Sequence, residues 1–315
     1  MQKQQTQQDL LHDFLNVYWL RPEVALFLAL SSHVLQEAPF LPVEKPSLDL
    51  GAGNGLFSFI SMGGNLTLDY DVYLNAGNLE KFWENQDIYD NFSNRGDGKF
   101  IARKPIHTFS IGFDKKENLM KQASFLNLYE DYKIGDANKT WPLGDGRLKS
   151  IFSNIFYWLK GPEFLFRETS RVLGQGGRCF LALQDPSFPN YCPSYRSQDF
   201  SKYKQVLKLL NRGRSESYLW RVPLRELENL AESNGLKVIY HRYYLSETVL
   251  RIWDIGLRPL SPVLISMANS LSPEQRIRHK KEWIDTLSKL LFPIFEADKE
   301  TQNRGGYLYL ILEKI

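Results

Sequence analysis

The stretch 47–59, SLDLGAGNGLFSF, places three glycines between two apolar segments. The apolar residues before the glycines predict a short buried strand, and those after them predict a short helix. A glycine-rich turn between a strand and a helix lets a bound nucleotide approach the backbone closely, because glycine has no side chain to block it. The stretch therefore predicts a nucleotide site, and the question is which nucleotide.

The spacing of the glycines separates two classes of nucleotide site. Gly51, Gly53 and Gly55 follow the pattern G-x-G-x-G. Dinucleotide-binding turns follow G-x-G-x-x-G and place their third glycine where this sequence has Leu56. Asp49 adds a carboxylate that would repel a pyrophosphate and attract a positively charged group. The pattern therefore favours a cofactor with a cationic end.

Strands and helices are predicted to alternate along the rest of the chain. After the first strand, further strands are predicted at 107–114, 132–136, 148–155, 178–185, 236–245 and 305–315. Amphipathic helix patterns separate most of them, and such an alternation is typical of a mostly parallel sheet covered on both faces. We therefore expect an α/β fold with a doubly wound, seven-stranded, mostly parallel sheet.

Three stretches interrupt the alternation. Residues 1–40 are predicted to form an N-terminal helical cap, and 41–315 the main domain with insertions at 63–106 and 246–304. The second insertion has a helical pattern with Ser272 as a predicted N-cap and Gln275 at the capping-box position. The first is rich in acidic and aromatic residues, so it is either a flap that binds a sugar or a cation, or a solvated surface loop.

The segment DLGAGNG, at 49–55, resembles the signature D/E-x-G-x-G-x-G of Rossmann-like (class I) methyltransferases that use S-adenosylmethionine (SAM). IGFD, at 111–114, resembles the second strand of this family. FRETSRVLGQGGRCFLAL, at 166–183, resembles its helix–turn–strand motif, with Gln175 where proline is usual. The resemblance covers roughly 45–60 and 107–245 and the last strand. It implies SAM as the cofactor and a small molecule as the methyl acceptor.

The resemblance also implies which residues hold the cofactor. They are Asp49, Gly51, Ala52, Gly53, Gly55, Asp114, Asp136, Ala137 and Asn154. In this family the acid at the end of the second strand, here Asp114, accepts hydrogen bonds from the ribose hydroxyls. The acid after the third strand, here Asp136, approaches the adenine amino group, and Ala137 would offer its backbone.

The ribose acid lies unusually far from the glycines. Asp114 follows Gly51 by 63 residues, where about 20 are usual in nucleotide-binding folds of this kind. We interpret 63–106 as an insertion that creates this distance. An alternative places the ribose acid inside the insertion, at Asp69 or Asp71. We prefer Asp114 because a helix pattern and the IGDA motif follow it at the expected interval.

Methyl transfer requires the acceptor atom to be aligned with the methyl group, and a hydroxyl acceptor also benefits from a general base. Tyr157 and Asp185 follow the fourth and fifth strands, which face the acceptor in this family. Asp185 is a candidate base, or it caps a turn before Pro186. Tyr157 is a candidate catalytic residue that more simply shapes the acceptor pocket. We expect no metal site.

Composition limits the partners. A net charge of +3 does not favour a nucleic-acid partner. The two cysteines can form neither a disulfide framework nor a zinc site by themselves, so a reducing, cytoplasmic location is expected. The apolar stretch 252–271 could contact a membrane surface through 249–295, or it could form the buried underside of a helical cap. The sequence does not predict the oligomeric state.

Our leading hypothesis is SAM-dependent methyl transfer to a hydroxyl oxygen of a sugar, a glycolipid or another metabolite. A non-catalytic SAM-binding module is an alternative, because no residue is a convincing base. A nicotinamide-dependent oxidoreductase is a second alternative, against which the glycine spacing and Asp49 both count.

Overall fold

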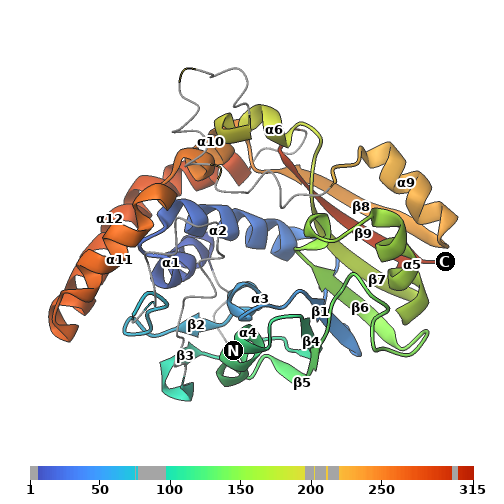
Figure 1. Cartoon of the computed structure of the whole chain (residues 1–315), viewed down its shortest axis with the longest axis horizontal. Coiled ribbons are helices and arrows are strands. Elements are labelled where there is room, and N and C mark those ends of the chain that lie inside the picture. The colour runs from blue at the N-terminus through green and yellow to red at the C-terminus, as the bar shows by residue number, and fades with distance from the viewer. Residues whose placement is uncertain are drawn as a thin grey trace.

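The chain folds around a seven-stranded sheet, which lies in the right half of the view in Figure 1. The computed structural model describes residues 6–74, 76, 97–195, 202, 211, 220–299 and 304–315. In spatial order the strands are β5 (Tyr129–Ile134), β4 (Phe109–Asp114), β1 (Ser47–Leu50), β6 (Leu148–Ser153), β7 (Leu173–Gln184), β9 (Tyr307–Lys314) and β8 (Leu236–Tyr244). Neighbouring strands are parallel except that β9 is antiparallel to both β7 and β8. The predicted mostly parallel, seven-stranded sheet is confirmed.

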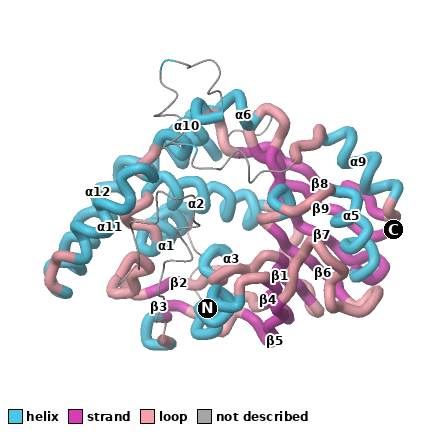
Figure 2. Tube along the Cα trace, in the orientation of Figure 1, coloured by secondary structure: helices cyan, strands magenta, loops and turns pink. Residues whose placement is uncertain are grey.

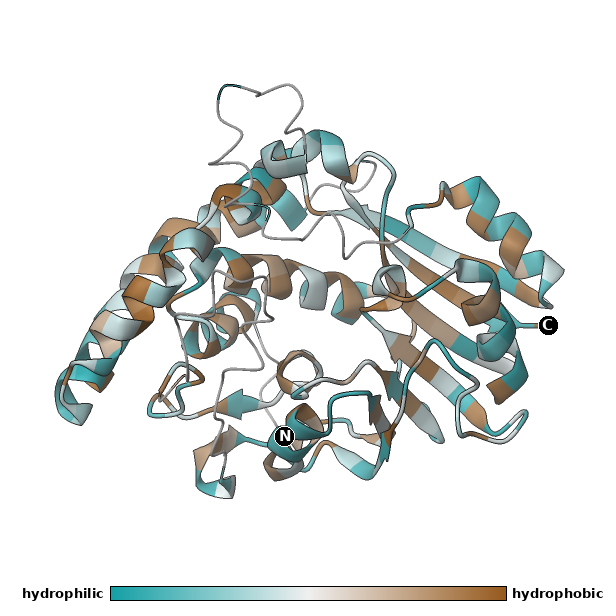
Figure 3. Cartoon of the chain, in the orientation of Figure 1, coloured by the Kyte–Doolittle hydropathy of each residue, from teal (hydrophilic) through white to brown (hydrophobic). Residues whose placement is uncertain are grey.

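Both faces of the sheet are buried. Tyr307, Tyr309 and Ile311 of β9 belong to one hydrophobic cluster, whereas the alternate residues Leu308 and Leu310 belong to a second. Successive side chains of a strand point to opposite faces, so β9 contributes to two cores. A parallel strand buried on both faces is rich in apolar residues, and brown segments are frequent in the central strands of the sheet (Figure 3).

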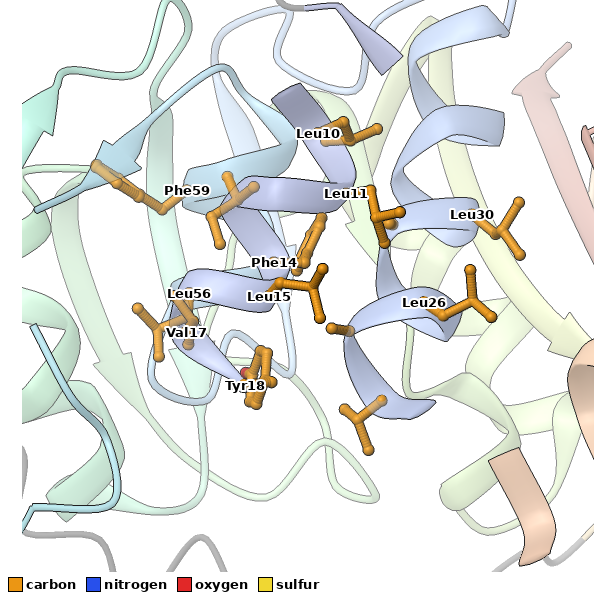
Figure 4. Close-up of a cluster of buried hydrophobic side chains, with 14 of the residues drawn as sticks. Leu10, Leu11, Phe14, Leu15, Val17, Tyr18, Leu26, Leu30, Leu56 and Phe59 are labelled. Atoms are coloured by element: carbon orange, nitrogen blue, oxygen red, sulfur yellow. The ribbon is translucent and has the colours of Figure 1, made fainter. Parts of the chain in front are cut away.

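Different helices cover the two faces of the sheet. Figure 2 shows the helices in cyan and the strands in magenta. The first core contains residues of α1 (Gln7–Val17), α2 (Pro22–Glu37), α3 (Leu56–Ser61), α4 (Glu117–Ala123), α10 (Glu247–Ile255), α11 (Ser261–Asn269) and α12 (Pro273–Lys299). The second contains residues of α5 (Pro162–Val172) and α9 (Leu224–Ser233). Figure 4 shows Phe14 and Leu15 of α1 lying between α2 and α3. Thus α1 and α2 share one core with the sheet, and the predicted division at residue 40 stays a prediction.

Short elements complete the chain. They are α6 (Phe188–Tyr191), β2 (Asn65–Leu66), β3 (Ile101–Arg103) and the 3-10 helices η3 (Gly98–Phe100), η4 (Ser124–Leu126), η5 (Phe156–Trp158), η6 (Pro193–Tyr195) and η8 (Arg258–Leu260). The helical insertion before the last strand is confirmed, because α10 to α12 lie between β8 and β9. Its predicted capping box is present, since the Gln275 N–H donates to Ser272 Oγ (3.3 Å) and the Ser272 N–H donates to Gln275 Oε1 (3.1 Å).

Several predicted strand boundaries are wrong. β5 begins at Tyr129 and ends at Ile134, where 132–136 was predicted, and the end of β6 and the start of β9 each differ from the prediction by two residues. β4 begins at Phe109 rather than at residue 107. β7 begins at Leu173, five residues before the predicted start, because the chain pairs with β6 directly after α5 ends. The pairing is irregular between Leu148 and Ser150, so the glycines after Leu173 form the irregular start of the strand instead of a separate turn.

The first insertion contains a small sheet of its own, formed by β2 and β3 outside the seven-stranded sheet. Asp71, which follows it, accepts hydrogen bonds from Trp19 Nε1 (3.1 Å) and Arg276 Nε (2.9 Å). Lys280 donates to the carbonyl oxygens of Leu68 (2.9 Å) and Tyr70 (2.5 Å). We call Asp71, Trp19, Arg276 and Lys280 the Asp71 network. It joins the N-terminal helices, the first insertion and α12, and it leaves Asp114 as the acid at the end of the second strand in the sheet. Residues 75 and 77–96 of this insertion, which hold most of its acidic and aromatic side chains, lie outside the described residues.

The apolar stretch 252–271 is divided between two environments. Trp253, Ile265 and Ala268 are buried, whereas Ile255, Leu260, Val263 and Met267 are exposed. Within the described residues, no helix has both the length and the apolar character that crossing a membrane requires. The buried underside of a cap accounts for part of this stretch, and surface contact with a membrane through 249–295 stays a prediction.

Candidate functional site

The glycine loop follows β1 at the carboxyl edge of the sheet, where β4 lies on one side and β6 on the other. Ligands of open α/β sheets bind at such a reversal of strand order. Gly51, Gly53 and Gly55 have φ angles of 80°, 54° and 72°, which favour glycine. A Cβ on Gly51 would lie 2.2 Å from Ile155 Cγ1, whereas a Cβ on Gly53 would meet nothing within 4 Å. Gly51 thus permits close packing of two loops, and Gly53 faces open space.

The glycine and Ala52 N–H groups of the loop are paired within the protein, whereas the Asn54 N–H has no partner among the described residues. A phosphate-binding loop needs N–H groups that point at the ligand. Here each glycine N–H, and that of Ala52, has a protein acceptor. Gly51 and Ala52 donate to Phe113 O (2.8 and 3.1 Å), Gly53 donates to Asp114 Oδ2 (3.0 Å), and Gly55 donates to Ala52 O (2.9 Å). The loop is therefore poorly suited to a pyrophosphate.

Asp49 lies buried beneath the loop, with 2% of its surface exposed. Its Oδ2 accepts hydrogen bonds from Ser58 Oγ and Tyr129 OH, both at 2.6 Å. Burial raises the pKa of Asp49 to about 6, and the nearby charge of Asp114 adds to the rise. The carboxylate is therefore mainly ionised at neutral pH, and it places a negative charge under the loop in a region of low dielectric constant. Direct contact of Asp49 with a ligand stays a prediction.

Asp114 and Asp136 stand at the ends of the adjacent strands β4 and β5. Asp114 Oδ1 accepts from the Lys116 N–H (2.8 Å), so each of its oxygens is oriented by one backbone group. Asp136 Oδ1 accepts from the N–H (3.0 Å) and Nδ2 (2.9 Å) of Asn138, and these hydrogen bonds, the backbone one foremost, lower the pKa of Asp136. The Gly135 N–H donates to Asp114 O (3.0 Å) and holds the two strand ends together. Both partly exposed carboxylates can accept further hydrogen bonds, as ribose hydroxyls or an adenine amino group would supply.

Two other predicted residues offer polar groups at the same edge. Ala137 O accepts from Trp141 Nε1 (3.1 Å), and the Ala137 N–H has no hydrogen-bond partner in the described part of the chain. The Asn154 side chain, after β6, likewise makes no hydrogen bond to a described residue and is partly exposed. Ser153 Oγ donates to Leu50 O (2.9 Å), which ties the end of β6 to the end of β1. These groups are available to a ligand that lies across β1, β5 and β6.

Aromatic side chains gather beyond β6 and β7. The ring of Tyr157, in η5, meets the ring of Tyr307 edge-on at 5.7 Å between centroids. Tyr307 also contacts Phe27 of α2 (5.2 Å) and Phe188 of α6 (5.5 Å), and Phe27 stacks on Trp253 of α10 (5.4 Å). We call these five residues the acceptor-side cluster. The sequence singled out only Tyr157, and a high aromatic content was the only signal for the others.

Asp185 caps a turn directly after β7. Its Oδ1 accepts from the N–H (2.8 Å) and the Oγ (2.5 Å) of Ser187, as the alternative interpretation of the sequence expects. Its other carboxylate oxygen has no hydrogen-bond partner among the residues that the structure describes, and the residue is partly exposed. Its role as a general base therefore stays a prediction.

Comparison with known proteins finds similar solved structures at low sequence identity. No family model matches the chain, and no curated protein matches its sequence. A SAM-dependent methyltransferase from Thermotoga maritima is 13% identical with a TM-score of 0.45, over 98% of this chain and 100% of that chain. A geranyl diphosphate methyltransferase in complex with SAM is 12% identical with a TM-score of 0.40, over 93% and 90% of the two chains. The [4+2]-cyclase SpnF is 14% identical with a TM-score of 0.46, over 93% and 82%. At these identities and TM-scores the matches carry no argument about the activity of this chain.

Proposed function

We propose that the chain binds SAM at the glycine loop and transfers its methyl group to a small-molecule acceptor. The observation that carries this proposal is the chemistry of the loop, whose glycine N–H groups are paired within the protein above the buried carboxylate of Asp49. SAM brings a sulfonium and an ammonium group, which a negative charge attracts. A nicotinamide dinucleotide would bring a pyrophosphate, which the same charge repels and for which the loop offers no free glycine N–H.

The residues at the ends of β4 and β5 fit the nucleoside part of SAM. Asp114 and Asp136 would accept hydrogen bonds from the ribose hydroxyls and the adenine amino group. The Ala137 N–H would donate to a ring nitrogen of adenine. When bound, SAM supplies a methyl group on a positively charged sulfur. The open space beside Gly53 leaves room for SAM at the loop.

For the acceptor atom we propose a hydroxyl oxygen of a sugar, a glycolipid or another metabolite. Asp185 would take up the hydroxyl proton with the carboxylate oxygen that Ser187 does not engage. Tyr157 would fix the position of the acceptor through its contacts with Tyr307. Alignment of the acceptor with the methyl group would supply much of the acceleration.

Isothermal titration calorimetry tests the cofactor. We expect the wild-type protein to bind SAM and not NAD. Asp114→Ala should weaken SAM binding by roughly 100-fold or more, because two charge-assisted hydrogen bonds are lost. Asp131→Ala is the matched control, since Asp131 is an exposed acid of β5 that pairs with Lys133. Equal SAM affinity of Asp114→Ala and the wild type, or tighter binding of NAD than of SAM, would refute the assignment.

A screen for release of S-adenosylhomocysteine tests the transfer. We expect release with at least one hydroxyl-bearing acceptor. SAM binding without release from any acceptor would instead support the second candidate, a non-catalytic SAM-binding module.

A further inference from the structure

Arg221 holds a buried amino group without a partner. Its Nε donates to Gln184 Oε1 (3.0 Å), and its guanidinium carbon lies 5.7 Å from the ring centroid of Phe188 and 5.6 Å from that of Tyr195. Its Nη2 is enclosed and makes no hydrogen bond. No described carboxylate forms an ion pair with Arg221. An arginine is always charged, and leaving one of its buried donor groups without an acceptor is unfavourable.

The position of Arg221 is fixed by contacts on both sides. Gln184, the last residue of β7, is buried and donates through Nε2 to Tyr307 OH (3.0 Å). Trp220 Nε1 donates to Leu159 O (2.9 Å), which holds the preceding residue against the loop after β6. The guanidinium is therefore held at the carboxyl ends of β6 and β7, in contact with Phe188 of the acceptor-side cluster.

The distance between the glycine loop and Arg221 is short enough for one small molecule to span it. β1 and β7 are separated only by β6 in the sheet. Neighbouring strands lie about 4.8 Å apart, so the ends of β1 and β7 are roughly 10 Å apart. A molecule that reaches Arg221 from the methyl-donor side therefore passes over the end of β6, where Tyr157 lies.

We propose that Arg221 binds an anionic group, a carboxylate or a phosphate, on the methyl acceptor. The planar guanidinium matches the two oxygens of such a group, and its unpaired amino group supplies the donor. Phe27 is partly exposed and the other four members of the acceptor-side cluster are buried, so the apolar part of the same molecule would lie against Phe27. The inference rests on the proposed function and narrows the acceptor to hydroxyl compounds that carry an acid group. Nη2 itself is enclosed, whereas Arg221 as a whole is only partly buried, so an anion must displace the groups that cover Nη2.

Binding of simple anions tests the site without any turnover. Benzoate and phenyl phosphate are titrated by calorimetry, and benzamide and phenol serve as their uncharged counterparts. We expect the wild type to bind at least one anion more tightly than its counterpart. Arg221→Gln should weaken that binding by roughly tenfold or more, because one charge-assisted hydrogen bond is lost. Comparison of the two anions shows whether a carboxylate or a phosphate fits better.

Two further variants make the result decisive. Arg225→Gln removes the same charge from an exposed arginine four residues away and should leave anion binding unchanged. Arg221→Lys keeps the charge without the planar fork, so we expect binding weakened several-fold. It replaces Arg221→Gln if that variant fails to fold. The proposal is overturned if neither anion binds the wild type, or if anion binding is the same in the wild type and the Arg221 variants.

Failure of the anion site at Arg221 can be distinguished from failure of the proposed methyl transfer. Loss of anion binding in Arg221→Gln with unchanged SAM affinity supports both proposals. Anion binding that depends on Arg221 in a protein that does not bind SAM would leave the anion site standing and remove the methyl transfer. In an active protein, acceptors with a free acid group should release S-adenosylhomocysteine at least tenfold faster than their amides or dephosphorylated forms, and Arg221→Gln should remove this preference.

Discussion

The cofactor side of the site, at the ends of β1, β4 and β5, differs in construction from the acceptor side, at the ends of β6, β7 and β9. On the cofactor side, short loops hold carboxylates with backbone N–H groups, as Gly53 and Lys116 hold Asp114. On the acceptor side, long side chains from distant segments contact each other, as Phe27 and Trp253 contact through their rings. Under the proposed function, backbone geometry would therefore govern cofactor binding, and side-chain choice would govern the acceptor. Substitutions on the two sides should have separable effects.

The largest effect is expected at Gly53, where the cofactor side depends on the absence of a side chain. Gly53→Val places a side chain in the open space beside the loop and should weaken SAM binding by roughly 100-fold or more, as measured by calorimetry. The left-handed backbone should also lower the free energy of unfolding by roughly 2 kcal/mol. Gly146→Val is the matched control, because Gly146 has a φ of 63° and open space around its Cβ but lies before β6, at the opposite edge. It should show the same loss of stability with normal SAM binding.

The same difference explains which part of the site the sequence could predict. The glycine loop and Asp114 follow from motifs of a few residues, because strand ends and turns are local features. The insertion before Asp114 changed only the number of residues between Gly51 and Asp114. The contact of Asp49 with Tyr129 could not be predicted, since 80 residues separate the two side chains. The sequence therefore identified Asp49 but not its burial.

The contacts of the acceptor-side cluster could not be predicted from the sequence either, because its residues are far apart in the chain. Phe27, Trp253 and Tyr307 come from two helices and the last strand, and no periodicity relates them. Arg221 follows a segment with no clear pattern, and only the fold brings it to Gln184. Of the acceptor-side cluster only Tyr157 could be found, because it closely follows a predicted strand, and Asp185 was found in the same way.

A second prediction concerns the boundary of the cofactor side. Asp71 was the alternative ribose acid, but its carboxylate forms a buried ion pair with Arg276. Removing one partner of a buried pair leaves the other charge uncompensated, so Asp71→Asn should lower the free energy of unfolding by about 3–5 kcal/mol. SAM affinity, measured below the unfolding temperature, should remain normal. Asp145→Asn removes an exposed partner of Arg171 and should cost less than about 1 kcal/mol. Weakened SAM binding with unchanged stability in Asp71→Asn would move the ribose site into the insertion.

A third prediction uses the buried charge of Asp49 on the cofactor side. The folded pKa of about 6 lies above the unfolded value of 3.8, so the folded state binds the proton more tightly. Stability due to the protonated carboxyl is fully present below pH 3.8 and is lost as the pH rises through 6. The difference in pKa corresponds to about 3 kcal/mol, an upper limit for the cost of the charge at neutral pH.

Asp49→Asn removes that charge and keeps the size of the side chain. We expect the variant to exceed the wild type in free energy of unfolding at pH 8, by up to about 3 kcal/mol, and this advantage should shrink as the pH falls from 6 to 4. Urea unfolding at several pH values measures it. SAM binding should weaken at the same time, since the attraction for a cationic ligand is lost. The exposed Asp69→Asn should change neither quantity. An unfavourable buried charge next to the glycine loop is expected to serve ligand binding. If Asp49→Asn has normal SAM affinity, and if its stability differs from that of the wild type by the same amount at pH 5 and pH 8, this expectation is wrong. Asp49 would then be only a structural partner of Ser58 and Tyr129.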